Sequence, residues 1–199
     1  MRKVATAAML VLALGAASGC TVVVPGTPAP APSALGEAPA PPAGPAAGTF
    51  SDAQGRFGLV PPTGWTVDTS GARGTAAAFL APESTGTTIG AFTANINVIV
   101  LPSSGALSAT VSGARHQLTA LKGYREARDE PLVLSDGTPA HLLGGTFDDP
   151  ASGFALRNLQ LFTVDGRSTI VVTGTALAET WDVYEPVFTS SLSTLTVAS

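Results

Sequence analysis

Residues 92–100, FTANINVIV, decide the fold class of this chain. Apolar side chains occupy every second position and mostly polar ones lie between them, so that Phe92, Ala94, Ile96, Val98 and Val100 alternate with Thr93, Asn95, Asn97 and Ile99. Successive side chains of a strand point to opposite faces, so a period of two predicts a β-strand with one apolar face. Asn95 and Asn97 would then share its polar face.

Short strands are predicted upstream of this stretch, at residues 57–60, 65–67 and 76–81. Pro61-Pro62-Thr63-Gly64 separates the first two, and such a cluster of proline and glycine forces a bend. Downstream, the period changes and predicts a helix, because apolar residues recur three and four apart at Leu107, Val111, Ala114, Leu118 and Leu121. Ser103 or Ser104 would cap its start and Gly123 its end, and its apolar face would pack on the sheet.

Four further strands are predicted after this helix, at residues 132–135, 140–147, 154–164 and 168–176. The steps Asp136-Gly137 and Asp165-Gly166 suit tight hairpin turns, so neighbouring strands should be antiparallel. A closing helical pattern follows, in which Pro186 predicts an interruption with a restart near that residue. A last short strand at Leu195 and Val197 would close the sheet, and the whole pattern predicts an α+β fold.

The N-terminus has the pattern of an export signal that ends at a lipid-attachment site. Arg2 and Lys3 precede an apolar run over residues 4–14, which is shorter than the ~20 apolar residues of a membrane-spanning helix. The segment Ala17-Ser18-Gly19-Cys20 resembles a bacterial lipobox, although Ala17 replaces the more usual leucine. We therefore predict a signal peptide over residues 1–19, lipid attachment at Cys20 and anchoring at the extracytoplasmic face of the cell membrane. An ordinary signal peptide is the alternative.

Residues 20–48 are predicted to form a disordered tether that begins at the lipidated cysteine. Between Thr21 and Gly48, eight prolines, eight alanines and four glycines account for 20 of 28 residues, and Glu37 is the only charged residue. Such a composition cannot bury a core. At ~3.1 Å per residue in the polyproline conformation, the tether would span up to ~85 Å.

Residues 49–199 are predicted to form one domain of 151 residues. Of the 10 basic and 14 acidic residues of the chain, Arg2, Lys3 and Glu37 lie outside this domain, which leaves it with eight basic and 13 acidic residues. This acidic balance argues against nucleic acid as a partner and against electrostatic adhesion to anionic lipid heads.

Motifs of known enzymes are missing from the sequence. It has no Gly-x-Ser-x-Gly elbow, no phosphate-binding loop and no dinucleotide fingerprint. Ser70, Ser112 and Ser152 each precede a glycine and are interpreted as turn or helix-surface residues. His116 and His141 are the only histidines, too few for a zinc site, so no cofactor, no metal and no catalytic residue are predicted.

Two short motifs in the predicted strands and loops have two interpretations each. Asp148-Asp149 would supply a weak calcium site or, with Pro150 and Gly153, a solvated turn. Gly144-Gly145 lies inside a predicted strand, where glycine indicates a bulge or a close backbone contact.

The closing helix carries an aromatic stripe. Trp181, Tyr184 and Phe188 share one face with Leu192, and packing against the sheet is the simpler explanation of such a stripe. The alternative is a ligand groove between helix and sheet, with Trp181 and Tyr184 on one side and the amides of Asn95 and Asn97 orienting the ligand.

Several of these segments resemble one known family. The stretch Phe57-Gly58-Leu59-Val60-Pro61-Pro62-Thr63-Gly64-Trp65, the strand over residues 94–100 and the hairpins over 137–175 look like an actinobacterial LpqN/LpqT-type lipoprotein. The resemblance covers the whole folded domain. It implies a Mog1/PsbP-like fold, an antiparallel sheet of about six to seven strands with helices packed on both sides. It also implies a non-catalytic envelope module, without catalytic or ligand residues that transfer to numbered positions.

Three functions remain open at this point. The first is a binding module for an apolar envelope ligand, such as a cell-wall lipid, or for a membrane-protein partner. The second is an envelope ester hydrolase with an unrecognised serine nucleophile. The third is an accessory of envelope biogenesis or secretion that makes protein contacts only.

Overall fold

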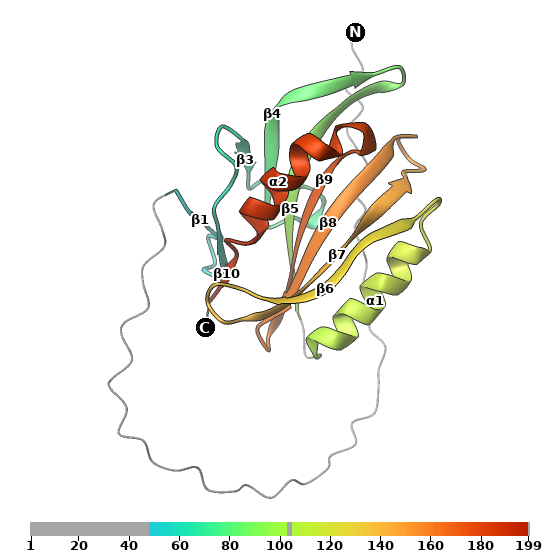
Figure 1. Ribbon diagram of the computed structural model, residues 1–199. Helices are drawn as coiled ribbons and strands as arrows, with labels where there is room; N and C mark the ends of the chain where they lie inside the picture. Colours follow the sequence, from blue (N-terminus) through green and yellow to red (C-terminus); the bar gives the residue numbers. More distant parts are fainter. Residues whose placement is uncertain (1–47, 103–104, 199) are drawn as a thin grey trace, which may run out of the picture.

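Seven antiparallel strands form the main sheet, in the order β3-β4-β5-β9-β8-β7-β6 (Figure 1). The computed structural model describes residues 48–102 and 105–198. The strands of this sheet are β3 (Thr66–Asp68), β4 (Ala77–Thr87), β5 (Gly90–Pro102), β6 (Arg125–Val133), β7 (Pro139–Asp148), β8 (Ala155–Val164) and β9 (Ser168–Leu177). A second, three-stranded sheet consists of β1 (Phe50–Ser51), β2 (Phe57–Leu59) and β10 (Thr196–Val197). The predicted α+β class is confirmed.

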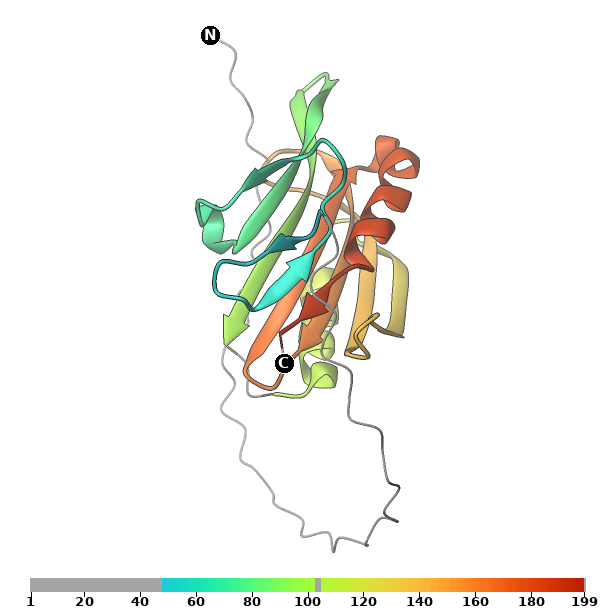
Figure 2. The ribbon, with the colours of Figure 1, turned by 90° about the vertical axis from the view of Figure 1, so that its left-hand side faces the viewer.

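Helices cover both faces of the main sheet, as predicted (Figure 2). α1 (Leu107–Thr119) packs on one face, mainly against β7 and β8, and α2 (Trp181–Leu192) packs on the other. Consecutive residues of β8 separate the two cores, since Leu161 lies in the cluster beneath α2 and Phe162 in the cluster beneath α1. We call these two sides the α2 face and the α1 face. Two short 3-10 helices, η1 (Ala72–Gly74) and η2 (Ala178–Thr180), complete the fold.

The hairpin of β4 and β5 is longer than the sequence pattern predicts. Both strands continue to a turn at Thr88 and Ile89, and their register shifts between Leu80 and Ser84. Beyond this irregularity Phe92 leaves the core of Ala94 and Ile96 and packs on Phe154, with 5.7 Å between ring centroids. The prediction that Phe92 shares one apolar face with those residues is therefore wrong.

The edge strand β6 begins seven residues before the predicted start at Leu132. Its first part, REARDEP, is largely charged and contains Pro131, features that protect a sheet edge from pairing with other chains. The hairpin turns predicted at the two Asp-Gly steps are confirmed, and Gly137 and Gly166 have φ angles of 86° and 87° there.

Three predictions about the ends of elements are wrong. α2 runs without a break through Pro186, because the packing of its aromatic stripe outweighs the one missing N–H donor. β10 pairs with β2 in the small sheet and does not extend the main one. α1 has Ala106 as its N-cap and Ala120 as its C-cap, so the predicted caps do not close it, and Ser103 and Ser104 lie outside the described residues.

Candidate functional site

The aromatic stripe of α2 is part of the core on the α2 face. The Phe188 ring lies at its centre, with centroid distances of 5.6 Å to Trp181, 5.9 Å to Tyr184 and 6.1 Å to Trp65. Trp181 and Phe188 are buried and Tyr184 is half-buried. Core packing, the simpler of the two interpretations, accounts for these contacts. Arg157 covers the Trp181 ring, with its guanidinium carbon 4.8 Å from the ring centroid.

Asn95 and Asn97 lie on the α1 face, opposite to Trp181 and Tyr184. Ile96, between the two asparagines, belongs to the same core cluster as Trp181, and side chains alternate along β5. One groove cannot therefore contain all four residues, and that part of the prediction is wrong. Whether either pair contacts a ligand stays a prediction.

The two asparagines belong to a larger group of uncharged polar side chains, which we call the polar ladder. Antiparallel register places them in two rows across β5, β9 and β8, and the rows consist of Asn97, Thr173 and Gln160, and of Asn95, Thr175 and Asn158. The Asn97 Nδ2 donates to Asn95 Oδ1 at 2.5 Å, and Gln160 Nε2 donates to Thr173 Oγ1 at 3.4 Å. The same period-two alternation that singles out Asn95 is present around Gln160 in β8 and Thr173 in β9, and it is the signal that could have revealed these residues.

One buried polar atom of this ladder has no partner. Gln160 is 3% exposed, and its Oε1 accepts no hydrogen bond from the described residues. Gln160 Nε2 donates one hydrogen bond to Thr173. If the amide were flipped, its oxygen would face Thr173 and its nitrogen would become the buried atom without a partner. An unpaired buried amide atom costs about 1–3 kcal/mol.

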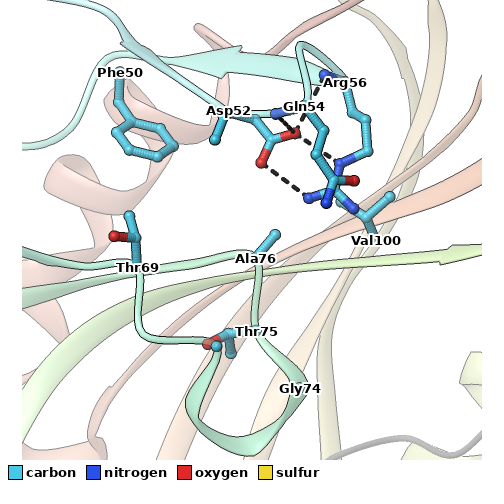
Figure 3. Close-up of a pocket in the computed structure, with 11 residues that line it drawn as sticks. Phe50, Asp52, Gln54, Arg56, Thr69, Gly74, Thr75, Ala76 and Val100 are labelled. Carbon is cyan, nitrogen blue, oxygen red and sulfur yellow. Dashed lines mark hydrogen bonds and ion pairs between the residues drawn. The ribbon is translucent and has the colours of Figure 1, made fainter.

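A cavity of about 430 Å³ lies between the loop that joins β1 to β2 and the loop that contains η1 (Figure 3). Its apolar wall comes from Phe50, Ala76 and Val100. The polar lining includes Asp52 and Arg56, with further contributions from Ala53, Gln54, Thr69, Gly71, Gly74 and Thr75. No period or motif of the sequence described above predicts this cavity.

Asp52 and Arg56 form a bidentate ion pair beside the cavity. Arg56 Nε is 2.6 Å from Asp52 Oδ2, and its Nη2 is 2.9 Å from Oδ1. The hydrogen bonds from the Arg56 side chain lower the pKa of the Asp52 carboxyl, against the opposing effect of burial. The spacing of four residues around Gly55 is a local signal that could have revealed the pair. Two of the five Arg56 N–H groups serve Asp52, which leaves others for a ligand.

His141 joins a polar clamp that fixes α1 to the sheet. Arg115 on α1 binds Asp129 on β6 through Nε at 2.6 Å and Nη2 at 2.9 Å, and His141 Nε2 lies 2.7 Å from Asp129 Oδ1. These hydrogen bonds, that of Arg115 first, lower the pKa of Asp129 to about 2. His116 is exposed on α1.

In the Asp148-Asp149 loop, the Asp149 carboxylate accepts hydrogen bonds from the loop itself, namely from the backbone N–H groups of Ala151 and Ser152 and from the Ser152 hydroxyl. This geometry is the turn interpretation of the motif. Within residues 48–102 and 105–198, no group of three or more His, Cys, Asp or Glu side chains is placed to hold a metal ion.

Gly144 and Gly145 are confirmed as sites of close backbone contact. A Cβ on Gly144 would lie 2.6 Å from the Asn158 carbonyl oxygen, and one on Gly145 would lie 2.5 Å from that of Arg125 and 2.6 Å from the Tyr124 ring. Of the other predicted turn serines, Ser70 accepts a hydrogen bond from the Ala72 N–H.

Comparison with solved structures identifies the fold. LpqN, which is involved in cell envelope biogenesis of Mycobacterium tuberculosis, superposes with a TM-score of 0.61 at 15% identity, over 76% of this chain and 90% of that chain. This chain has the LpqN fold. Protein PA94 of unknown function from Pseudomonas aeruginosa has a TM-score of 0.54 at 16% identity, over 76% of this chain and 96% of its own. Cyanobacterial PsbP from Synechocystis has a TM-score of 0.51 at 16% identity, over 75% and 91%.

The structural resemblance suggested by the sequence is thus confirmed at the level of the fold. No family model matches the sequence. No curated protein matches it either. The predicted lipid attachment at Cys20 lies outside the described residues. In the part of the chain that the structure describes, no helix is long and apolar enough to cross a membrane.

Proposed function

We propose that this protein is a lipid-anchored, extracytoplasmic binding module of the cell envelope that carries an amphipathic, largely apolar envelope molecule and catalyses no reaction. The LpqN fold supports an envelope role, since LpqN itself is involved in cell envelope biogenesis. The lipobox-like segment that ends at Cys20 supports the anchor and the location at the membrane.

The observation that carries the binding function is the cavity beside Asp52 and Arg56. Its volume of about 430 Å³ falls within the range of small-molecule sites. Phe50, Ala76 and Val100 offer apolar contact for one part of a ligand, and the Arg56 N–H groups that do not donate to Asp52 offer hydrogen bonds for its polar head (Figure 3). Such a combination suits an amphipathic molecule better than a fully polar one.

The surroundings of the histidines favour binding over hydrolysis. A serine hydrolase needs a histidine that is oriented by a carboxylate and faces a serine. The carboxylate beside His141 is Asp129, which is held on both oxygens because Arg115 also binds it. This arrangement fastens α1 to β6 and β7, and among the described residues no serine is hydrogen-bonded to His141.

The cavity function is tested by native mass spectrometry of the protein extracted from membranes. We expect a lipid of defined mass to co-purify with the unaltered chain and to be lost from Thr69→Trp, which places an indole at an exposed rim position. Thr63→Trp is the matched control, because Thr63 is also exposed and does not line the cavity. Absence of any bound lipid from the unaltered chain, or equal lipid in both variants, would remove the proposal.

The anchor is tested separately, by cell fractionation of Cys20→Ser. We expect the variant to leave the membrane fraction, because the sulfur that would carry the diacylglyceryl group is gone. If the variant stayed in the membrane fraction as fully as the unaltered chain, lipid attachment at Cys20 would be wrong.

A further inference from the structure

We propose that the polar ladder on the α1 face is a second binding site, and that it takes an uncharged sugar chain. This goes beyond the function proposed above, because it names another ligand class at another place. The ladder lies on the opposite face of the main sheet from Trp181 and Tyr184, and none of its residues lines the cavity.

The chemistry of the ladder matches hydroxyl groups. All six of its side chains are amides or hydroxyls, each of which both donates and accepts hydrogen bonds. A sugar hydroxyl likewise donates one hydrogen bond and accepts two. Asn97 and Asn95 form a directed chain, in which Asn97 donates to Asn95 and Asn95 donates to the Thr93 carbonyl oxygen. Such a chain offers further donors and acceptors along β5.

The rows of the ladder carry no charge. Following the register from β3 to β6, the row of Asn97 meets an ionisable residue only at its two ends, Asp68 and Asp129, and the row of Asn95 meets one only at its β6 end, Glu126. A charged ligand would therefore lose hydration without a counter-charge. On β4 the same rows continue with Ala78 and Leu80, half-buried apolar side chains that suit the carbon faces of a sugar.

The unpartnered Gln160 amide indicates a missing ligand group. Buried polar atoms almost always have a hydrogen-bond partner. Gln160 is 3% exposed and its Oε1 accepts no hydrogen bond from the described residues, so this atom requires an explanation. Thr173, its hydrogen-bond partner, is half-buried, and α1 packs mainly on β7 and β8 beyond it. Because Gln160 Oε1 is itself buried, a ligand hydroxyl would reach it only after the half-buried Thr173 side chain turned aside, and it would then donate to Oε1 and complete the hydrogen bonds of the amide.

The site lacks the features of a protein interface. Interface centres are rich in aromatic residues and arginine. The ladder contains neither, and it also lacks the apolar surface that an acyl chain needs. A sugar chain is the occupant that its composition favours.

The test is titration calorimetry on the full chain, purified from membranes in detergent, with three uncharged probes: maltotetraose, cellotetraose and tetra-N-acetylchitotetraose. We expect at least one of them to bind. Gln160→Met and Thr173→Val keep the shape of each side chain while removing its hydrogen bonds, so each should weaken binding by about tenfold. Gln54→Met, the same chemical change at a cavity residue, should leave sugar binding unaltered.

Thermal unfolding of the same variants separates a binding role from a structural one. A glutamine kept for a ligand is replaced by methionine without loss of melting temperature, because the change removes an unpaired buried atom. The proposal fails if none of the three sugars binds, or if binding survives both ladder substitutions. It also fails if these substitutions change only the association of the protein with itself and leave sugar binding unchanged. Thr69→Trp reports on the cavity alone, so either site can fail without the other.

Discussion

Gly174 lies beneath the Phe188 ring, and its replacement by alanine tests the packing of α2. A Cβ at this position would lie 2.6 Å from both Cγ and Cδ1 of Phe188 and 3.1 Å from its Cβ. Ordinary contacts of a Cβ are 3.4–4 Å, so the ring would have to move by roughly 0.8 Å. Phe188 is fully buried and touches three other aromatic rings, so it cannot move alone.

The size of the effect follows from two opposing contributions. Alanine in place of a strand glycine normally stabilises by about 0.5–1 kcal/mol, because the unfolded chain has less freedom to lose. Overpacking of a tight core costs about 1–3 kcal/mol. Since the ring is held by Trp65, Trp181 and Tyr184, we take the upper end of that range, and the net loss is about 2 kcal/mol. For a domain of this size, the melting temperature of Gly174→Ala should fall by about 4–8 °C.

The measurement is thermal and urea unfolding of Gly174→Ala beside Gly86→Ala. Gly86 is also a strand glycine, but a Cβ there meets nothing within 4 Å, so the control should be neutral or slightly stabilising. In the double variant with Phe188→Leu, the two losses should be less than additive, because the smaller side chain relieves the clash. A melting temperature of Gly174→Ala at or above that of the unaltered chain would refute the described packing of α2.

Three further predictions concern the clamp, the cavity and α1. The Asp129 pKa of about 2 lies below its unfolded value of 3.8, so its stabilisation is present above pH 3.8 and lost as pH falls towards 2; the melting temperature of Asp129→Asn should change less over this range than that of the unaltered chain. Asp52→Ala leaves Arg56 and two backbone N–H groups without their acceptor and should cost about 1–3 kcal/mol in urea unfolding, whereas an unchanged midpoint would contradict the ion pair. Gly113→Ala, within α1 and facing open space, should stabilise by about 0.5–1 kcal/mol, and a lower melting temperature would show that the position is crowded.

The fold was predictable wherever a segment buries one face. The alternation around Ile96 predicts the centre of β5, and the three-and-four spacing around Val111 predicts α1, because each pattern reports contact with a core. The outer part of the β4–β5 hairpin and the charged start of β6 carry no such signal. These strands are held by hydrogen bonds between backbones, and such hydrogen bonds do not require a particular pattern of side chains.

The candidate sites were less predictable, because a strand pattern does not say which helix covers which face. The polarity of Asn95 follows from alternation, but its separation from Trp181 depends on α1 and α2 packing on opposite sides of the sheet. The cavity depends on two loops that are separate in the sequence, those of Arg56 and Thr75. Only the local spacing of Asp52 and Arg56 was available in advance.

Single strands of the main sheet bury apolar side chains on the α2 face and uncharged polar side chains on the α1 face. In β8, Leu159 and Leu161 are buried on the α2 face, and Asn158 and Gln160 are equally buried among their neighbours on the other. Stability alone would favour apolar residues at all four positions, because a buried amide contributes only when its hydrogen bonds are complete. The Gln160 amide is incomplete, so the fold of the described residues does not account for it. A buried amide that destabilises the free protein, and whose hydrogen bonds a ligand would complete, is the feature expected of a binding site. Titration with sugars therefore tests directly why Gln160 is present on the α1 face.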